Sequence, residues 1–183
     1  LHATKTIGVG EGGFAVFGTT EAAQRFRAWT NFGFDESRDA SFRATNAKMS
    51  EIVAAANLIQ LKHAKEIFSG WREARRLVLE MAKATELVCF SPYGGELSPY
   101  FIVVFNDANE RKAAEVALKE KRIGTRRWWS DGCHRMEAFA TVAREPLRNT
   151  TKIAGRYLGL PFFPGISLQQ VEQIGEALVL GKS

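Results

Sequence analysis

The residues with the clearest chemical potential lie at the start of the chain, where one lysine stands between a histidine and a group of glycines. Residues 2–5 read HATK and residues 10–13 read GEGG. A lysine amine can bond covalently to a carbonyl carbon, and glycines let a backbone turn tightly and approach a bound group. A single lysine is ordinarily a solvated surface charge, so the chemical interpretation of Lys5 depends on its neighbours. Because the chain opens on this stretch without a methionine, we expect further sequence to precede it.

The same glycines satisfy the pattern GxGxxG over residues 8–13. A dinucleotide-binding loop follows a strand and opens a helix, so that the pyrophosphate meets the helix N-terminus. Here the glycines lead into the apolar run 12–18, which predicts a buried strand, and the dinucleotide interpretation is disfavoured. No Gly-Lys-Ser/Thr follows, so the stretch is not a Walker loop. The cysteines and histidines lack metal-ligand spacing, and we expect no metal site.

A second candidate for chemistry is the polar and aromatic segment 126–134, which reads RRWWSDGCH. Aromatic faces pack on sugar or base rings, and arginine binds phosphate strongly. The candidate ligand contacts by this chemistry are Arg126, Trp128 and Trp129. The alternative is an interface loop whose tryptophans bury area, with the histidine in a structural role.

Composition limits the class of protein. Of the 183 residues, 45% are hydrophobic and 25% are charged, which predicts a soluble globular chain of one domain, or one domain with part of another. The net charge of +5 and the pI near 9.4 fit either a slight excess of surface cations or an anionic partner. No apolar run approaches the ~20 residues that cross a bilayer, so we expect no membrane partner. Two cysteines and no secretory pattern favour the cytoplasm.

Local patterns predict the elements that position these residues. In chain order they are a strand over 12–18, a helix over 19–29, a long helical stretch from 48 that bends at 69–70, strands over 87–90 and 100–105 joined by a turn-rich loop, a helix over 106–121, a short strand over 123–126 and a helix from 167. Ser167 and Gln170 have capping-box spacing. The expected buried face of this last helix is Leu168, Val171, Ile174 and Leu178. The fold class is therefore α/β.

The opening stretch resembles the active-site segment of the DegT-type sugar aminotransferases, which are fold type I enzymes dependent on pyridoxal 5'-phosphate. Their pattern is roughly Ser-x-His-x-x-Lys, a few residues and Gly-Glu-Gly-Gly before a strand; the serine would stand just before Leu1. Other stretches of the chain resemble family motifs in order and spacing: NFGF at 31–34, TNAKMSEI at 45–52, GTRRWW at 124–129, GCH at 132–134 and LPFFP at 160–164. The resemblance covers nearly the whole chain.

The resemblance implies a fold, a cofactor and its ligands. Residues 1–66 would be the C-terminal end of the aspartate-aminotransferase-like large domain, and residues 67–183 would be the small C-terminal α/β domain. Lys5 would attach pyridoxal 5'-phosphate covalently and act in catalysis. Asn46 and Lys48 would bind the cofactor phosphate of the neighbouring subunit in a homodimer with shared active sites. Asn46 also stands where it could cap a helix, and Lys48 replaces the commoner arginine.

The resemblance also implies an activity, which is transfer of an amino group, with glutamate as the expected donor, to a nucleotide-linked keto-sugar. Such a reaction belongs to amino-sugar or polysaccharide biosynthesis in the cytoplasm. Arg126, Trp128, Trp129 and His134 match the family's substrate loop. The family's front portion supplies the partner of the pyridine nitrogen and the aromatic that stacks on the ring, so we expect the isolated chain to be inactive.

Two other functions remain open from the sequence. The chain could be a non-catalytic truncated remnant that acts as a dimerising or regulatory binding module. It could also bind nucleic acid, an interpretation that rests only on the basic pI and on residues 126–129. We expect no nucleic-acid partner.

Overall fold

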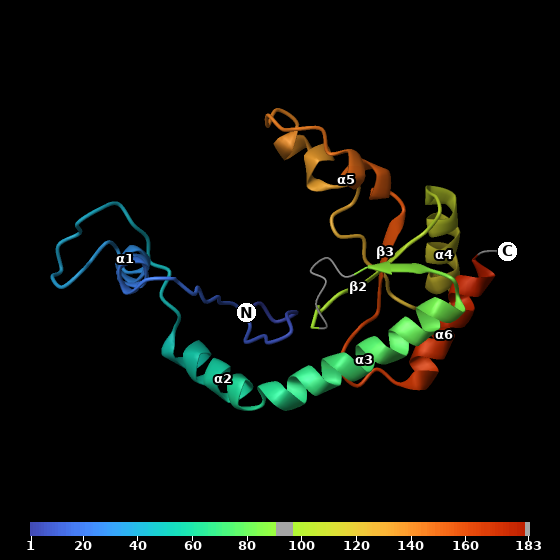
Figure 1. Cartoon of the computed structure of the whole chain (residues 1–183), viewed down its shortest axis with the longest axis horizontal. Helices are drawn as coiled ribbons and strands as arrows, with labels where there is room; N and C mark the ends of the chain where they lie inside the picture. The colour runs from blue at the N-terminus through green and yellow to red at the C-terminus, as the bar shows by residue number, and fades with distance from the viewer. Residues whose placement is uncertain (91–96, 182–183) are drawn as a thin grey trace. The chain divides into compact units, whose positions relative to one another are not determined.

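The computed structural model describes residues 1–90 and 97–181 and divides the chain into two compact units, Leu1–Lys65 and Glu66–Ser183 (Figure 1). We call them unit 1 and unit 2 and describe each by itself. Their assignment to the large and small domains of an aminotransferase stays a prediction. Most of the predicted loop 91–99 lies outside the described residues. Within the described residues, no helix combines the length and apolarity needed to span a membrane.

Unit 1 contains two helices whose starts follow from their capping residues. Helix α1 covers Thr20–Thr30, and the Thr19 hydroxyl accepts a hydrogen bond from the Ala22 N–H at 3.2 Å. This confirms the helix predicted over 19–29. Helix α2 covers Glu51–Lys62 and begins after Ser50, whose side chain accepts from the Val53 N–H. None of the residues of α2 is buried.

The strand predicted over 12–18 is wrong. These residues form no regular element, and Phe14 and Val16 are 79% and 86% exposed. A strand needs a neighbour for its backbone N–H and C=O groups, and among the described residues of unit 1 the structure contains only isolated bridges. The apolar run therefore stays irregular and largely exposed, apart from Phe17, whose ring packs against Phe26 of α1.

The long helical stretch breaks at a different place from the one predicted. Helix α2 ends at Lys62 with His63 as its C-cap, and helix α3 covers Ala64–Ala84 and continues through Gly70. A Cβ added at Gly70 would lie 3.1 Å from the Cβ of Pro164, so this glycine serves a close approach between α3 and the chain before the last helix. The predicted bend at 69–70 is therefore wrong.

Unit 2 is built on a three-stranded antiparallel sheet in the order β1-β2-β3. The strands are β1, Val88–Phe90; β2, Phe101–Val104; and β3, Tyr157–Leu160. The first two confirm predicted strands, whereas β3 was not predicted. The predicted strand over 123–126 is wrong, because only Arg126 bridges to the sheet, opposite Gly159.

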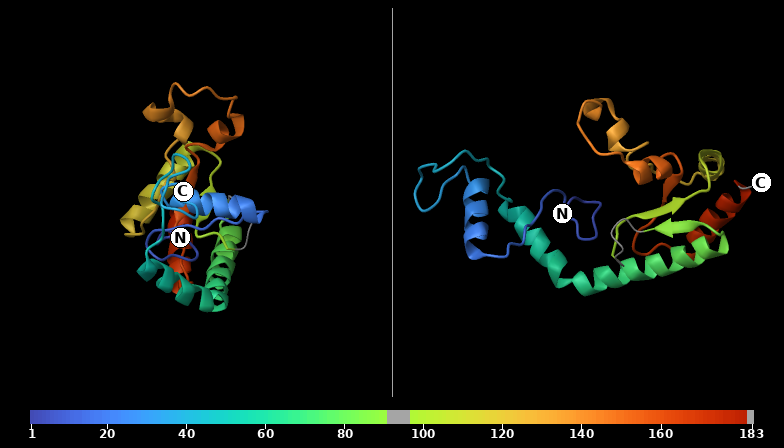
Figure 2. Two further views of the ribbon diagram at one scale, coloured as in Figure 1. Left: turned by 90° about the vertical axis from the view of Figure 1, so that its left-hand side faces the viewer. Right: turned by 45° about the horizontal axis from the view of Figure 1, so that its top comes forward.

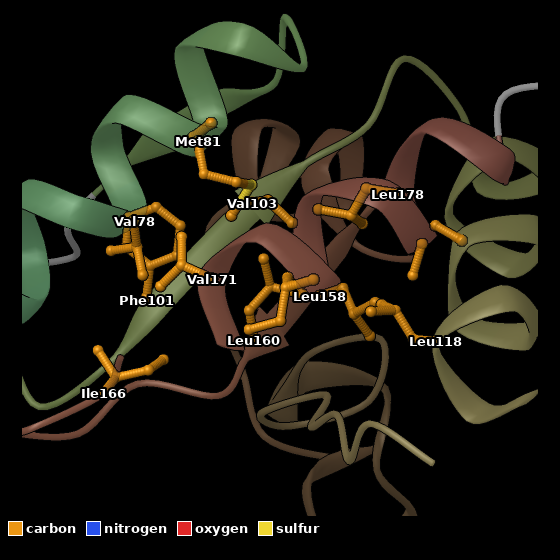
Figure 3. Close-up of a cluster of buried hydrophobic side chains, with 14 of the residues drawn as sticks. Val78, Met81, Phe101, Val103, Leu118, Leu158, Leu160, Ile166, Val171 and Leu178 are labelled. Carbon is orange, nitrogen blue, oxygen red and sulfur yellow. The ribbon is translucent and has the colours of Figure 1, made fainter. Parts of the chain in front are cut away.

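The two faces of this sheet are covered by different elements. Helix α3, helix α4 over Ala108–Glu120 and helix α6 over Leu168–Leu180 enclose the main core, whose fully buried members include Val78, Val103, Leu118, Leu158 and Leu178 (Figure 3). Helix α5 over Arg148–Ile153 lies on the other side of the sheet from α3 (Figure 2). The two 3-10 turns are η1, Cys133–Arg135, and η2, Glu137–Phe139. The α/β class of the chain is confirmed.

The capping residues predicted the start of α6 correctly, whereas the predicted buried face of this helix is wrong at one position. Ser167 and Gln170 form the complete capping box, and Val171, Ile174 and Leu178 are buried as expected. Leu168 is 57% exposed, so its predicted burial is wrong. At 100° per residue, this first helical position lies to one side of the buried stripe.

The buried Leu158 and the exposed Leu168 offer a matched test of this core. We expect Leu158→Ala to lower the free energy of unfolding by about 2–5 kcal/mol, because it leaves a cavity between the sheet and the helices. Leu168→Ala should cost less than about 1 kcal/mol, since its side chain is already in water. Chemical denaturation of both variants measures the difference, and equal losses would contradict the assigned core.

Candidate functional site

Lys5 lies on a loop that is closed by its own backbone. The Lys5 N–H donates to the His2 carbonyl at 2.9 Å, which makes a tight turn directly before the lysine side chain. The two ends of the loop are joined by hydrogen bonds from Ala3 N–H to Gly10 O at 2.8 Å and from Val9 N–H to Leu1 O at 3.0 Å. Lys5 itself is exposed. The loop therefore presents a primary amine from a backbone of defined shape.

Small and polar residues maintain this loop. A Cβ added at Gly8 would lie 2.7 Å from the Ala3 carbonyl oxygen, so a side chain there would push the loop open. Glu11 lies 3.4 Å from the His2 ring, measured from Oε1 to Nε2, and the other ring nitrogen is 2.9 Å from the Thr4 hydroxyl. The His2 ring thus connects Thr4, inside the turn, with Glu11 in the glycine segment.

The predicted phosphate ligands Asn46 and Lys48 lie together beside the end of α1. Asn46 forms an isolated bridge with Asn31. The Lys48 ammonium donates to the Asn31 side-chain oxygen and lies 4.6 Å from the centre of the Phe32 ring. The alternative in which Asn46 caps the following helix is wrong, because Ser50 is the N-cap of α2.

Lys48 and its neighbour Met49 make contacts on different parts of unit 1. The Met49 methyl group reaches the loop that holds Lys5, where a Cβ added at Gly12 would lie 2.8 Å from it. The ammonium of Lys48 instead lies against Phe32. Met49 therefore ties this segment to the lysine loop, while Lys48 keeps its charge at the end of α1.

The donor set in unit 1 fits an aldehyde cofactor that carries a phosphate. Such a group needs a primary amine for its aldehyde and amide or ammonium donors for its phosphate. Lys5 supplies the first, and the exposed Asn46 and Lys48 supply the second. Added Cβ atoms at Gly10 and Gly13 would meet nothing within 4 Å, so there is open space beside the loop.

In unit 2, Trp128 is used for packing. Its ring meets Tyr100 edge-on with centroids 4.8 Å apart, and it covers the second hydrophobic cluster, formed by Ile102, Val104 and Tyr157. A Cβ added at Gly159 would overlap the Trp128 ring. This is the packing role that the sequence left open as an alternative to ligand contact.

Arg126 and Trp129 flank this anchor and remain accessible. The Arg126 backbone exchanges two hydrogen bonds with Gly159, at 3.0 and 2.7 Å, while its side chain is exposed. Trp129 is 61% exposed. The backbone of Arg126 is therefore held against β3, and the side chains of Arg126 and Trp129 are both accessible to a ligand.

Two supporting residues of this loop were missed from the sequence. The Arg127 guanidinium donates to Asp131 at 2.7 Å, and the Tyr157 hydroxyl donates to the Ser130 carbonyl at 2.6 Å. Burial raises the pKa of the Tyr157 hydroxyl, against the opposing charge of Arg127. The paired charges at Arg127 and Asp131, four residues apart, were the available signal for this brace.

His134 lies at a hollow of about 640 Å³ beside helix α5, which we call the α5 hollow. Its lining includes His134, Arg144, Glu145, Arg148, Thr151 and Lys152. The His134 Nε2 lies 3.4 Å from the Thr151 hydroxyl, which joins η1 to α5. Sequence reasoning found the histidine but not the cations around it.

The predicted site residues thus form two groups. Lys5, Asn46 and Lys48 belong to unit 1, whereas Arg126, Trp128, Trp129 and His134 belong to unit 2. Within the described residues, no cluster of histidine, cysteine or carboxylate side chains could hold a metal ion. The chemistry available is that of an amine in unit 1 and of aromatic and cationic contacts in unit 2.

Comparison with known proteins gives a consistent result. The profile of the DegT/DnrJ/EryC1/StrS aminotransferase family matches residues 1–179. A dTDP-4-amino-4,6-dideoxy-D-glucose transaminase of Shigella dysenteriae is 27% identical over 180 residues, which are 95% of this chain and 49% of that protein. The chain spans about half the length of the curated relatives it matches.

Solved structures show the same partial coverage. DesI, determined in the presence of its TDP-sugar product, is 32% identical, with a TM-score of 0.83 over 98% of this chain and 47% of its own. A candidate PLP-dependent aminotransferase from Bacillus cereus is 27% identical, with a TM-score of 0.89 over 97% of this chain and 49% of its own. The fold of the chain is therefore that of about half of such a protein.

The contact of Gly159 with Trp128 predicts a position that cannot take a side chain. We expect Gly159→Ala to lower the free energy of unfolding by about 1–3 kcal/mol and to change the tryptophan fluorescence, because the added methyl group displaces the Trp128 ring. Gly124→Ala is the matched control, since a Cβ there meets nothing within 4 Å. Similar effects of the two changes would contradict the packing role of Trp128.

The raised pKa of Tyr157 predicts a loss of stability in alkali. The fold favours the neutral phenol of Tyr157. Its contribution to the free energy of unfolding is therefore fully present below the unfolded pKa of about 10, and it is lost as the pH rises through the higher folded pKa. Unfolding free energies measured from pH 7 to 11 should fall more steeply for the unmodified protein than for Tyr157→Phe. Parallel curves would show that ionisation of Tyr157 is not linked to folding.

Proposed function

The chain belongs to the DegT/DnrJ/EryC1/StrS aminotransferase family, and we propose on this premise that it is the C-terminal part of a nucleotide-sugar aminotransferase. The reaction transfers an amino group, from glutamate as the proposed donor, to a nucleotide-linked keto-sugar in amino-sugar or polysaccharide biosynthesis. The observation that carries the proposal is the exposed Lys5 amine on its closed glycine loop, within the segment that matches the family. The proposal places the protein in the cytoplasm.

The proposed cofactor is pyridoxal 5'-phosphate. Lys5 would hold it through the side-chain nitrogen, and Asn46 with Lys48 would hold the phosphate of the cofactor bound in the neighbouring subunit. When bound, this cofactor supplies an electron-withdrawing ring that accepts electron density during amino transfer. The charge on Lys48 and the amide of Asn46 suit a phosphate dianion, although lysine offers a point charge rather than the paired donors of arginine.

Lys5 has a second proposed role in moving a proton. Its Nζ, as a free amine, would accept a proton from the carbon of the amino donor and give it back later in the transfer. The turn made by the Lys5 N–H and the His2 carbonyl fixes the backbone at the base of this flexible side chain. The His2 ring and Glu11 need not take part in proton transfer.

The residues of unit 2 have the proposed role of binding the sugar substrate. Trp129 offers an exposed aromatic face, and Arg126 offers an exposed guanidinium for phosphate or sugar oxygens. Trp128 would act indirectly, because its ring is occupied by Tyr100 and the Gly159 backbone. His134 would contact the substrate from the side of the α5 hollow.

A homodimer with shared sites is part of the proposal. Lys48 lies against Phe32 and Asn31, whereas its neighbour Met49 contacts the loop of Lys5. This divergence supports a phosphate site for another subunit rather than for the Lys5 of the same chain. The isolated chain is proposed to be inactive, because it spans only about half the length of the transaminases it resembles.

One observation favours the second candidate function, a non-catalytic binding module. Helix α2 has no buried residue and exposes its large apolar side chains: Ile52, Leu58, Ile59 and Leu61. An apolar surface of this kind is typical of an interface. The module would use this surface without any chemistry at Lys5, so testing the lysine separates the two candidates.

Covalent attachment at Lys5 is the decisive test. In the full-length protein incubated with pyridoxal 5'-phosphate, borohydride reduction should fix the cofactor on the peptide that contains Lys5, as seen by mass spectrometry. Lys5→Arg should abolish this label and lower transaminase activity by orders of magnitude, because arginine keeps the charge but lacks the reactive amine.

Lys62→Arg is the matched control, since Lys62 is exposed in the last turn of α2 and lies outside the lysine loop. It should label and react as the unmodified protein does. A protein that folds but takes no label at Lys5 would leave only the binding-module function.

A further inference from the structure

The α5 hollow gathers more positive charge than the loop of predicted substrate contacts. Arg144, Arg148 and Lys152 all line it, and Glu145 is the only carboxylate among its lining residues. Arg148 and Lys152 are four residues apart on α5, so they project from neighbouring positions on one side of the helix. Like charges at this spacing destabilise a helix unless something compensates them.

The protein itself does not compensate these cations. Over residues 1–90 and 97–181, neither Arg144, Arg148 nor Lys152 forms an ion pair, and Glu145 also forms none. Three other arginines of unit 2 do form ion pairs: Arg76 with Glu73 and Glu80, Arg111 with Glu115, and Arg127 with Asp131. The hollow therefore collects cations whose charge is left for a ligand or for solvent ions.

Two sets of contacts hold the walls of the hollow in place. The Arg144 guanidinium donates to the carbonyls of Phe139 at 3.1 Å and Val142 at 3.0 Å, which fixes its position beside η2. The contact of His134 with Thr151 joins η1 to α5 from the other side. The Arg144 guanidinium is thus held by its own segment, and α5 is joined to η1 by the contact of Thr151 with His134.

We propose that the α5 hollow is an anion site that binds the diphosphate of a nucleotide, with Arg148 and Lys152 as its main ligands and Arg144 as a positioning cation. The inference rests on the proposed function, which requires a nucleotide-linked substrate. It adds residues that neither the sequence motif nor the family comparison assigns.

The size and chemistry of the hollow favour a compact diphosphate over a nucleic-acid backbone. Its volume is about 640 Å³, and its cations lie within the short stretch 144–152 rather than along an extended stripe. A diphosphate carries adjacent negative groups that can be shared by two cations at neighbouring helix positions. His134 and Thr151 add uncharged donors and acceptors at the edge.

Calorimetric titration of the full-length protein with UDP and dTDP tests the site. We expect Arg148→Gln with Lys152→Gln to weaken binding of both nucleotides at least about tenfold, because charge-assisted hydrogen bonds to the phosphates are lost. The affinity for inorganic diphosphate should fall in parallel. Thymidine, which has no phosphate, should bind equally poorly to the unmodified protein and to the double variant. Exchanging the two cations, in Arg148→Lys with Lys152→Arg, should retain binding within about threefold.

The matched control is Lys112→Gln with Lys119→Gln on α4, which removes the same charge from exposed positions of unit 2 outside the hollow. It should bind UDP and dTDP as the unmodified protein does. If the double change on α5 prevents folding, Arg148→Gln and Lys152→Gln are measured singly, each with a smaller expected loss. Unchanged nucleotide binding in folded α5 variants, or an equal loss in the α4 control, would overturn the site.

Two further measurements separate this proposal from the proposed function and from nucleic-acid binding. Lys5→Arg should bind UDP and dTDP as the unmodified protein does. If the unmodified protein takes no cofactor label, while the α5 variants still lose diphosphate binding, the proposed function is refuted and the anion site stands. Random duplex DNA is titrated in parallel at several salt concentrations. If DNA binding depends on Arg148 and Lys152 while UDP and dTDP do not bind, the assignment of a diphosphate is wrong.

Discussion

The contact between Gly159 and the ring of Trp128 is the constraint on which the organisation of unit 2 depends. Gly159 lies in β3 between two residues that point into the main core, Leu158 and Leu160. On the other face its missing side chain leaves room for the indole, and its backbone pairs with Arg126. One strand thus connects the helix-covered core to the loop that offers ligand contacts.

This arrangement explains why adjacent and similar residues have different roles. Trp128 packs against the sheet and so anchors the loop to it. Trp129, the next residue, is left exposed. The next residues are braced by the bond between Arg127 and Asp131 and by the Tyr157 hydroxyl. A loop that can bind a ligand is therefore positioned by side chains that are themselves unavailable to it, as a binding site on a rigid scaffold requires.

The sequence predicted those elements whose signals are local. Helices α1, α4 and α6 begin with a hydroxyl or carboxylate that binds the first free N–H groups, and that chemistry is legible over a few residues. The strands depend on partners elsewhere: residues 12–18 have apolar character but no neighbour here, whereas β3 was missed although it pairs along its whole length with β2. For the same reason Lys5 could be found from a motif, while the cations of the α5 hollow meet His134 only after the chain has folded.

The main core also sets an order of events during synthesis. Its members run from Ala74 in α3 to Leu178 in α6, so the sheet lacks part of its cover until nearly all of this chain has left the ribosome. Non-local contacts of this kind form slowly and leave apolar strands open in the meantime. The apolar face of the sheet would then stay exposed until α6 emerges, and a premature stop codon before residue 171 would release a product unable to complete its core.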